Sequence, residues 1–313
     1  MYYPFLRGRQ NELLALQELL KNSKLSENIV PIIEPVKMSP TLLKTLRLFE
    51  ERKRTIVLIK NPKVGSLRSD IQNPKNAKNF ESLRDLVNAH ESFIKYGIYA
   101  GKKSVEQVAR IESNGFNVDD KVIAICLDRD VIDYCKDAFG KKESPVVVPY
   151  APSFRRIHNA KILIEDKFNK KARNSEYLDC PDEFFSEDHL YYDDYGYVGF
   201  SDYSIIGEEY SESGFAPYAV AIHIVYFDDK KELRIHHFVS DSNDDISDPA
   251  GKFYEALTKL HEWNQTHSLD TIAMNEFEKI YAMQTYPGLG VVKKLSVMHH
   301  LELISGFLDG ALS

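Results

Sequence analysis

The chain has 313 residues, of which 43% are hydrophobic and 28% charged, as is ordinary for a globular protein with a full core. Its formal net charge of −7 argues against a general nucleic-acid binder, because phosphate contacts need clustered Lys and Arg. No stretch reaches the roughly 18 apolar residues of a membrane span, and no signal-peptide region is seen. Three cysteines without CxxC spacing fit a reducing compartment. We expect a cytoplasmic protein that does not enter a membrane.

Short apolar runs alternate with helical patterns from the first residues onward. "YYPFLR" (2–7) precedes leucines at helical spacing, and "IVPIIEP" (29–35) and "TIVLIKN" (55–61) are runs of the same form. Ser39 is expected to cap the helix after the second run, with Pro40 in its first position. After "SFIKYGIYAG" (92–101), Ser104 is expected to cap a helix that ends at Gly115.

Four more runs complete a set of eight candidate strands: "KVIAICLD" (121–128), "SPVVVPYAP" (144–152), "KILIED" (161–166) and "YGYVGFSDYSI" (195–205). Near-continuous Val, Ile and Leu runs joined by helices predict a parallel sheet buried on both faces. An open doubly wound sheet would carry GxGxxG after its first strand, and "FLRGRQNE" (5–12) does not contain it. The pattern therefore favours an α/β fold of the TIM-like (β/α)8 barrel type.

The pattern changes after the eighth run. Residues 217–240 alternate between apolar and polar around a polar turn, which predicts a β-hairpin. Asp248 and Pro249 are expected to start a helix, and the rest of the chain reads as helical. We predict a single barrel-like domain over 1–313, decorated by a loop and hairpin at 206–247 and by C-terminal helices at 248–313.

Polar side chains follow the apolar runs. In a parallel barrel the loops at the carboxyl ends of the strands share one rim, so cations and carboxylates there would suit an anionic ligand. A carboxylate directly after a strand could act as an acid, a base or a ligand of a divalent metal. The simpler alternative is that charged residues mark the solvent boundary of each strand. The catalytic candidates are Glu34, Asp128 and Glu165, and the ligand-binding candidates are Arg7, Arg9, Lys37, Asn61, Lys63, Lys102, Asp202 and Tyr203.

The stretch "RGRQNE" (7–12) has two interpretations. Arg7 and Arg9 could clamp a phosphate or carboxylate. Alternatively, Glu12 pairs with Arg9 and Asn11 caps the first helix. Both remain open.

The segment "HHFVSDSNDDISD" (236–248) combines imidazoles with carboxylates. It matches a calcium loop at three positions, but Ile246 stands where the turn glycine should be. His236 and His237 are adjacent on a strand, so they should point to opposite faces and not share an ion. The Asp run is expected to cap the following helix, and His299 and His300 are expected to be structural.

No nucleophile elbow, Walker loop or HExxH motif is present. Two hypotheses follow. In one, the barrel is a hydrolase of a phosphorylated or nucleotide-like substrate, with a divalent metal as candidate cofactor. In the other, it is a non-catalytic module that binds a protein encoded nearby through the rim and the Tyr-rich loop 199–218.

Three motifs carry a resemblance to a known family: "YYPFLRGRQNELLAL" (2–16), "IVPIIEPVK" (29–37) and "GFSDYSI" (199–205). Together they resemble the bacterial and phage family known as "beta protein". That family has no settled activity, and the resemblance implies a mobile-element or phage-defence context. The matching positions that it marks for testing are Arg9, Glu12, Glu34, Asp202 and Tyr203.

Overall fold

The computed structural model describes residues 1–89, 92–211 and 217–311. The chain groups into two compact units. The first contains Met1–Leu13, Glu27–Asp166 and Tyr191–Tyr203, and the second contains Leu14–Ser26, Lys167–Leu190 and Ser204–Ser313. No helix among the described residues is long and apolar enough to cross a membrane.

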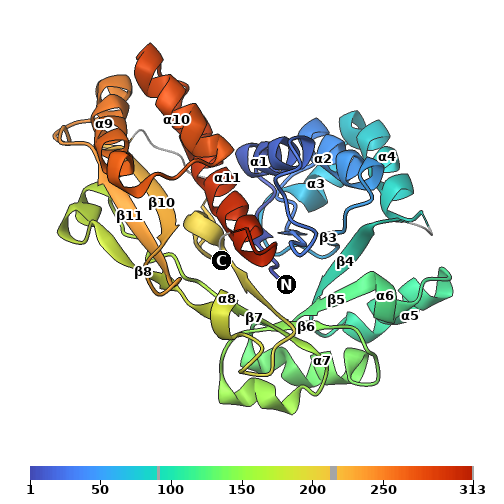
Figure 1. The fold of residues 1–313 in the computed structure, drawn as a ribbon. Coiled ribbons are helices and arrows are strands. Elements are labelled where there is room, and N and C mark those ends of the chain that lie inside the picture. Colours follow the sequence, from blue (N-terminus) through green and yellow to red (C-terminus); the bar gives the residue numbers. More distant parts are fainter. Residues whose placement is uncertain (90–91, 212–216, 312–313) are drawn as a thin grey trace. The chain divides into compact units, whose positions relative to one another are not determined.

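The first unit is a nearly closed barrel of eight parallel strands (Figure 1). Neighbouring strands pair in chain order, and an isolated bridge between Tyr2 and Phe200 joins the last strand to the start of the first. The predicted TIM-like barrel is confirmed, and the open doubly wound sheet is not found. The strands are β1 (Phe5–Leu6), β2 (Ile32–Ile33), β3 (Ile56–Ile59), β4 (Ile94–Tyr99), β5 (Val122–Ile125), β6 (Val146–Val148), β7 (Lys161–Glu165) and β9 (Gly199–Asp202).

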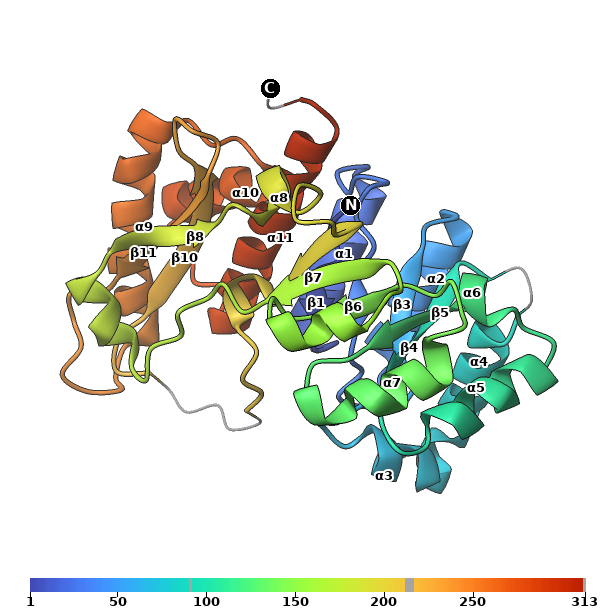
Figure 2. The same cartoon turned by 90° about the horizontal axis from the view of Figure 1, so that it is seen from below.

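Helices connect the barrel strands, and α4, α5 and α7 lie outside β4, β5 and β6 (Figure 2). The barrel helices are α2 (Pro40–Glu51), α3 (Leu67–Gln72), α4 (Ala77–Val87), α5 (Ser104–Ser113), α6 (Val118–Lys121) and α7 (Ile132–Phe139). Short 3-10 turns, η1 (Pro74–Asn76), η2 (Arg129–Val131) and η3 (Pro152–Arg156), complete the connections. Helix α1 (Gln10–Lys21) follows β1, and from Leu14 onward it groups with the second unit.

The predicted helix ends are mostly confirmed. The Ser39 side chain accepts a hydrogen bond from the Leu42 amide, 3.1 Å away, with Pro40 in the first position of α2. Gly115 follows α5 with a φ of 82°, a conformation that favours glycine. The expected cap at Ser104 is wrong, because α5 begins at Ser104 itself and Lys103 precedes it. The Ser104 hydroxyl instead accepts a hydrogen bond from the Gly101 amide and so closes the preceding turn.

Alternate side chains of the strands fill the barrel interior, as strand geometry requires. On β3, Val57 and Ile59 belong to the interior cluster, so Leu58 points outward. The alternation of inward and outward side chains along each strand therefore decides which polar residues at the strand ends can meet inside the barrel. The interior cluster contains Tyr3, Phe5, Val30, Ile32, Val57, Ile59, Tyr99, Ile123, Ile125, Val147, Ile162, Ile164 and Tyr203.

The second unit contains a three-stranded antiparallel sheet in the order β10, β11, β8, with α9 packed on β10 and β11 (Figure 1). The hairpin predicted over 217–240 is confirmed as β10 (Ala221–Phe227) and β11 (Leu233–Val239). Strand β8 (Asp182–Ser186) is an addition that the sequence pattern did not predict. The remaining elements are α8 (Asp188–Tyr191), α9 (Pro249–His267), α10 (Ile272–Met283), α11 (Leu289–Leu308), η4 (Asn174–Asp179) and η5 (Ser204–Ile206).

The residues that suggested a metal loop have structural roles in this unit. Asp248 caps α9 by accepting a hydrogen bond from the Gly251 amide, 2.9 Å away. His236 contacts Asp182 and His237 contacts Glu183, consistent with the opposite faces expected of adjacent strand residues. Among the described residues, no group of three or more His, Cys, Asp or Glu side chains could hold a metal ion.

Candidate functional site at the barrel rim

Four of the predicted rim residues share the inward face of the barrel. Arg7 follows β1 with the parity of Phe5, Glu34 follows β2 with that of Ile32, and Asn61 follows β3 with that of Ile59. Tyr203 after β9 belongs to the interior cluster itself. The carboxyl ends of parallel strands meet at one edge, so these side chains converge.

Glu34 is the centre of this cluster and is fully buried. One carboxylate oxygen, Oε2, accepts hydrogen bonds from the Arg7 guanidinium and from the Tyr99 hydroxyl, the latter 2.9 Å away. The other oxygen accepts one from the Lys63 backbone amide at 2.6 Å. Three donors, one of them cationic, therefore offset the cost of removing the carboxylate from water.

Arg7 completes the buried half of the cluster. Its guanidinium carbon lies 5.4 Å from the ring centroids of both Phe5 and Tyr203, which is within cation–π range. Only 10% of its side chain is exposed, against none for Glu34. The Arg7–Glu34 pair therefore anchors the two strand ends to each other, and Arg7 is shielded from the solvent that a ligand would come from.

Tyr99, at the end of β4, is a member of the site that the sequence analysis missed. Besides donating to Glu34, it is fixed through its backbone, because Asn61 donates to the Tyr99 carbonyl at 3.0 Å and accepts from its amide at 2.9 Å. Burial and the neighbouring Glu34 carboxylate raise the pKa of Tyr99, so it stays a neutral donor. Tyr99 comes two residues after Gly97, which packs on Ile59 inside the barrel. Strand alternation could therefore have placed the Tyr99 side chain inside the barrel as well.

Lys63 carries the solvent-facing half of the cluster. Its ammonium lies 4.6 Å from the Tyr99 ring centroid and 3.5 Å from an Asp128 carboxylate oxygen. The exposed fractions of these two ionic side chains are 49% for Lys63 and 67% for Asp128. An ion pair this exposed contributes about 0–1 kcal/mol, so a competing anion could replace Asp128 at small cost.

The loop that carries Lys63 is held against the loop after β2. Gly65 has a φ of 81°, and a Cβ added there would lie 2.1 Å from the Val36 carbonyl oxygen. The Ser66 amide donates to that same oxygen at 2.7 Å. Glycine at position 65 therefore lets the two loops approach, and this approach places the Lys63 amide on Glu34.

Other predicted site residues lie elsewhere. Asp202 accepts a hydrogen bond from the Tyr2 hydroxyl at 2.7 Å and is buried. By strand alternation, Asp202 and Glu165 lie on the faces opposite to Tyr203 and Ile164, so neither joins the inward cluster. Lys37 and Lys102 are exposed on the loops after β2 and β4.

The contacts of the "RGRQNE" residues bear on both interpretations of that stretch. Glu12 accepts a hydrogen bond from the Arg9 backbone amide at 3.3 Å, so it contacts the main chain of Arg9. Asn11 does not cap the helix, because α1 already begins at Gln10. Arg7 pairs with Glu34, which leaves the proposed double-arginine clamp without its first member.

Comparison with protein-family models, with curated proteins and with solved structures gives no match to this chain. The function is therefore inferred from the geometry of the described residues. The resemblance of the three motifs to the "beta protein" family stays a prediction.

Proposed function

We propose that this barrel recognises an anionic, phosphorylated ligand at its rim, with Lys63 as the cation that contacts the ligand. The observation that carries the proposal is the exposed Lys63–Asp128 pair above the buried Glu34 network. The network fixes the backbone of Lys63, while the ammonium stays open to solvent. A ligand phosphate would take the place of the Asp128 carboxylate beside that ammonium.

In this proposal Glu34 is a positioning residue. Both of its oxygens are engaged by donors and its side chain has no exposed surface, which suits holding a loop better than moving a proton. A hydrolytic function would also need Asp128 and Glu165 to act together with Glu34. Glu165, however, lies on the outward face of β7. Recognition is therefore the better supported activity. The phage-defence setting is proposed from the motif resemblance alone.

The proposal is tested by an NMR titration of the ¹⁵N-labelled protein with inorganic phosphate. The Lys63 backbone amide should shift saturably, because it lies at the base of the proposed site. Lys63→Gln keeps that amide and should weaken the apparent affinity at least about fivefold, which corresponds to roughly 1 kcal/mol. Lys78→Gln, on the exposed surface of α4, is the control and should change nothing. An unmoved Lys63 amide at saturating phosphate contradicts the proposal.

A second candidate is the non-catalytic interaction module, favoured by an exposed aromatic pair on the first unit. Tyr150 is 59% and Tyr195 53% exposed, and their ring centroids lie 6.1 Å apart. Exposed tyrosines are enriched at protein interfaces. Of the Tyr-rich loop that suggested this function, residues 212–216 lie outside the described residues. Co-purification with the product of a neighbouring gene, lost in Tyr150→Ser/Tyr195→Ser, would support this candidate, and retention in that variant would count against it.

A further inference from the structure

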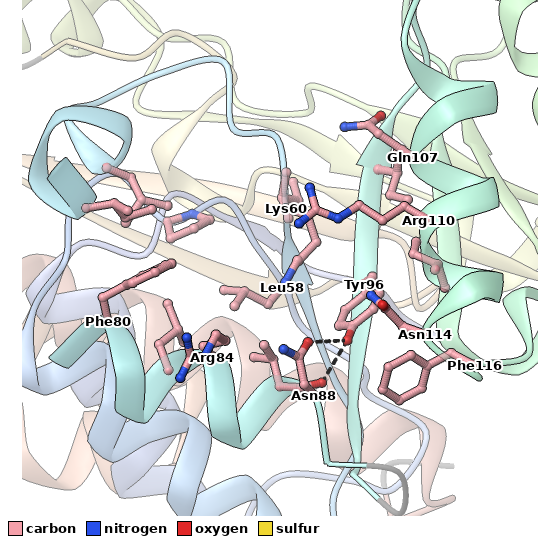
Figure 3. Close-up of a pocket in the computed structure, with 18 residues that line it drawn as sticks. Leu58, Lys60, Phe80, Arg84, Asn88, Tyr96, Gln107, Arg110, Asn114 and Phe116 are labelled. Carbon is pink, nitrogen blue, oxygen red and sulfur yellow. Dashed lines mark hydrogen bonds between the residues drawn. The ribbon is translucent and has the colours of Figure 1, made fainter. Parts of the chain in front are cut away.

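A separate pocket lies on the outer side of the barrel, over β3 and β4 and between α4 and α5 (Figure 3). Its volume is about 400 Å³, within the range of small-molecule sites. Leu58 and Tyr96 point into it, and both have the outward parity of their strands. The pocket is therefore distinct from the rim cluster, which lies on the inward face of the same strands.

Three cations face this pocket: Lys60 from the end of β3, Arg84 from α4 and Arg110 from α5 (Figure 3). No carboxylate is found among the described residues that line it. Burial and the nearby Arg110 guanidinium lower the pKa of Lys60. Bringing like charges together without a counter-ion is unfavourable, and a bound anion would remove that cost.

The ion pairs in the described part of the chain leave these cations available. Neither Lys60 nor Arg110 forms one there. Arg84 contacts only its neighbour Asp85, at 3.4 Å, where both side chains are more than half exposed. Such an exposed contact contributes little, so it would not compete with a phosphate for the guanidinium.

The rest of the lining is aromatic and amide-bearing. Phe80 and Phe116 are partly exposed at opposite walls, on α4 and just after α5 (Figure 3). The Tyr96 ring behind them is fixed because its hydroxyl donates to the Val87 carbonyl, 2.9 Å away, and contacts the Asn88 amide oxygen at 3.0 Å. Gln107 and Asn114 supply side-chain amides from α5 and its end. Flat apolar walls with amide donors and acceptors suit a heteroaromatic ring.

We infer that this outer pocket binds a nucleoside monophosphate. Lys60 and Arg110 hold the phosphate, Arg84 adds to the positive field, and the base lies between Phe80 and Phe116 with its edge toward Gln107 and Asn114. The site is independent of the rim function proposed above, and it would give the protein a second, chemically different ligand position.

The test is isothermal titration of the full chain with AMP at low ionic strength, where charge contacts are least screened. One AMP per chain is expected to bind at this pocket, separately from phosphate binding at the rim. Arg110→Gln and Arg84→Gln should each weaken it, Arg110→Gln at least about tenfold, which is roughly 1.4 kcal/mol. The matched control Lys78→Gln, on α4 outside the pocket, should bind AMP as the unaltered protein does, and Lys63→Gln at the rim should keep the binding that Arg110→Gln weakens.

Several outcomes would overturn the inference. Absence of AMP binding, or equal affinity for AMP and adenosine, would remove the role of the phosphate. Equal affinity for AMP and inorganic phosphate would remove the role of the aromatic walls. Loss of AMP binding in Lys63→Gln with retention in folded Arg110→Gln and Arg84→Gln would move the nucleotide to the rim. Tighter binding of single-stranded oligothymidylate than of AMP would indicate a polymer surface instead.

Discussion

At the residue scale, the inward part of the rim is built by Arg7, Glu34 and Asn61, which follow the neighbouring strands β1, β2 and β3. Glu34 and Arg7 are 27 positions apart and meet only because β1 and β2 are neighbours in the barrel. Strand alternation places Arg7, Glu34 and Asn61 on the inward face, and Asp202 and Glu165 on the outward face. Tyr99 was not predicted as a site residue because an aromatic side chain at the end of an apolar run is most simply interpreted as a core residue.

The buried Arg7–Glu34 pair should be costly to break on one side. Arg7→Met leaves Glu34 charged and without its cation, so we expect the free energy of unfolding to fall by about 3–5 kcal/mol, measured by urea denaturation followed by far-UV circular dichroism. Arg156→Met breaks the exposed pair with Asp133 and should cost less than about 1 kcal/mol. Equal losses in the two variants would contradict this account of the pair.

Gly65 offers a test of how the Lys63 loop is held. Gly65→Ala places a Cβ against the Val36 carbonyl oxygen at a positive φ, and we expect it to lower the free energy of unfolding by at least about 2 kcal/mol. In the matched variant Gly101→Ala the new Cβ meets nothing within 4 Å, so stability should change little. Thermal melts of both variants check this. An unchanged melting temperature in Gly65→Ala would show that the loop carrying Lys63 and the loop carrying Val36 need not approach each other.

At the element scale, periodicity and capping predicted most of the structure. The barrel strands, the capped starts of α2 and α9 and the hairpin follow from local sequence. Strand β8 could not be foreseen, because "DEFFS" shows no alternation of apolar and polar residues. Its two acidic residues are stabilised by groups on β11: Asp182 contacts Arg234 and His236, and Glu183 contacts His237. Such tertiary partners override a weak local signal.

Helix α11 should make the second unit sensitive to acid. His299 and His300 are fully buried on it, and burial lowers the pKa of His299 to about 4 and that of His300 to about 3. The unfolded chain binds protons at these histidines below about pH 6.5 while the folded chain does not, so stability falls as the pH drops below 6.5 and levels off near the folded values.

We therefore expect each of these histidines to lower the free energy of unfolding by about 2 kcal/mol between pH 7 and pH 5. Trp263, the single tryptophan, lies on α9 in the same unit and reports its unfolding in urea by fluorescence. His300→Asn should reduce this fall in the free energy of unfolding between pH 7 and pH 5 by the contribution of one histidine, about 2 kcal/mol. His158→Asn, an exposed position in the first unit, should leave the dependence unchanged. An unchanged pH dependence of the free energy of unfolding in His300→Asn would contradict this explanation.

At the scale of the whole molecule, the sequence predicted the eight-stranded barrel and the later hairpin and helices. It could not predict the grouping of α1 residues with the C-terminal elements, because that grouping depends on contacts between segments far apart in the chain. The outer pocket was equally hidden. Lys60, Arg84 and Arg110 lie on three different elements, and nothing in their spacing shows that they face one space.

The distribution of histidines predicts which unit opens first in acid. Eight of the ten histidines lie in the second unit, whereas in the described part of the first unit only exposed His158 is present. Hydrogen exchange followed by mass spectrometry, corrected for intrinsic rates, should show faster opening of β10, β11 and α11 at pH 5 than at pH 7. The strands β2 to β6 should keep their protection. Uniform acceleration across both units would contradict the prediction.

The bridge from Tyr2 to Phe200 has a consequence for how the protein is made. The residues that seal the barrel are nearly two hundred positions apart, since Ser201 donates to the Tyr3 carbonyl across 198 positions. During translation β1 therefore has one unpaired edge until β9, the last strand of the barrel, has left the ribosome. An unpaired edge of this kind invites mispairing and depends on slow, long-range contacts. Truncation before residue 199 should accordingly yield a chain that aggregates as it is synthesised.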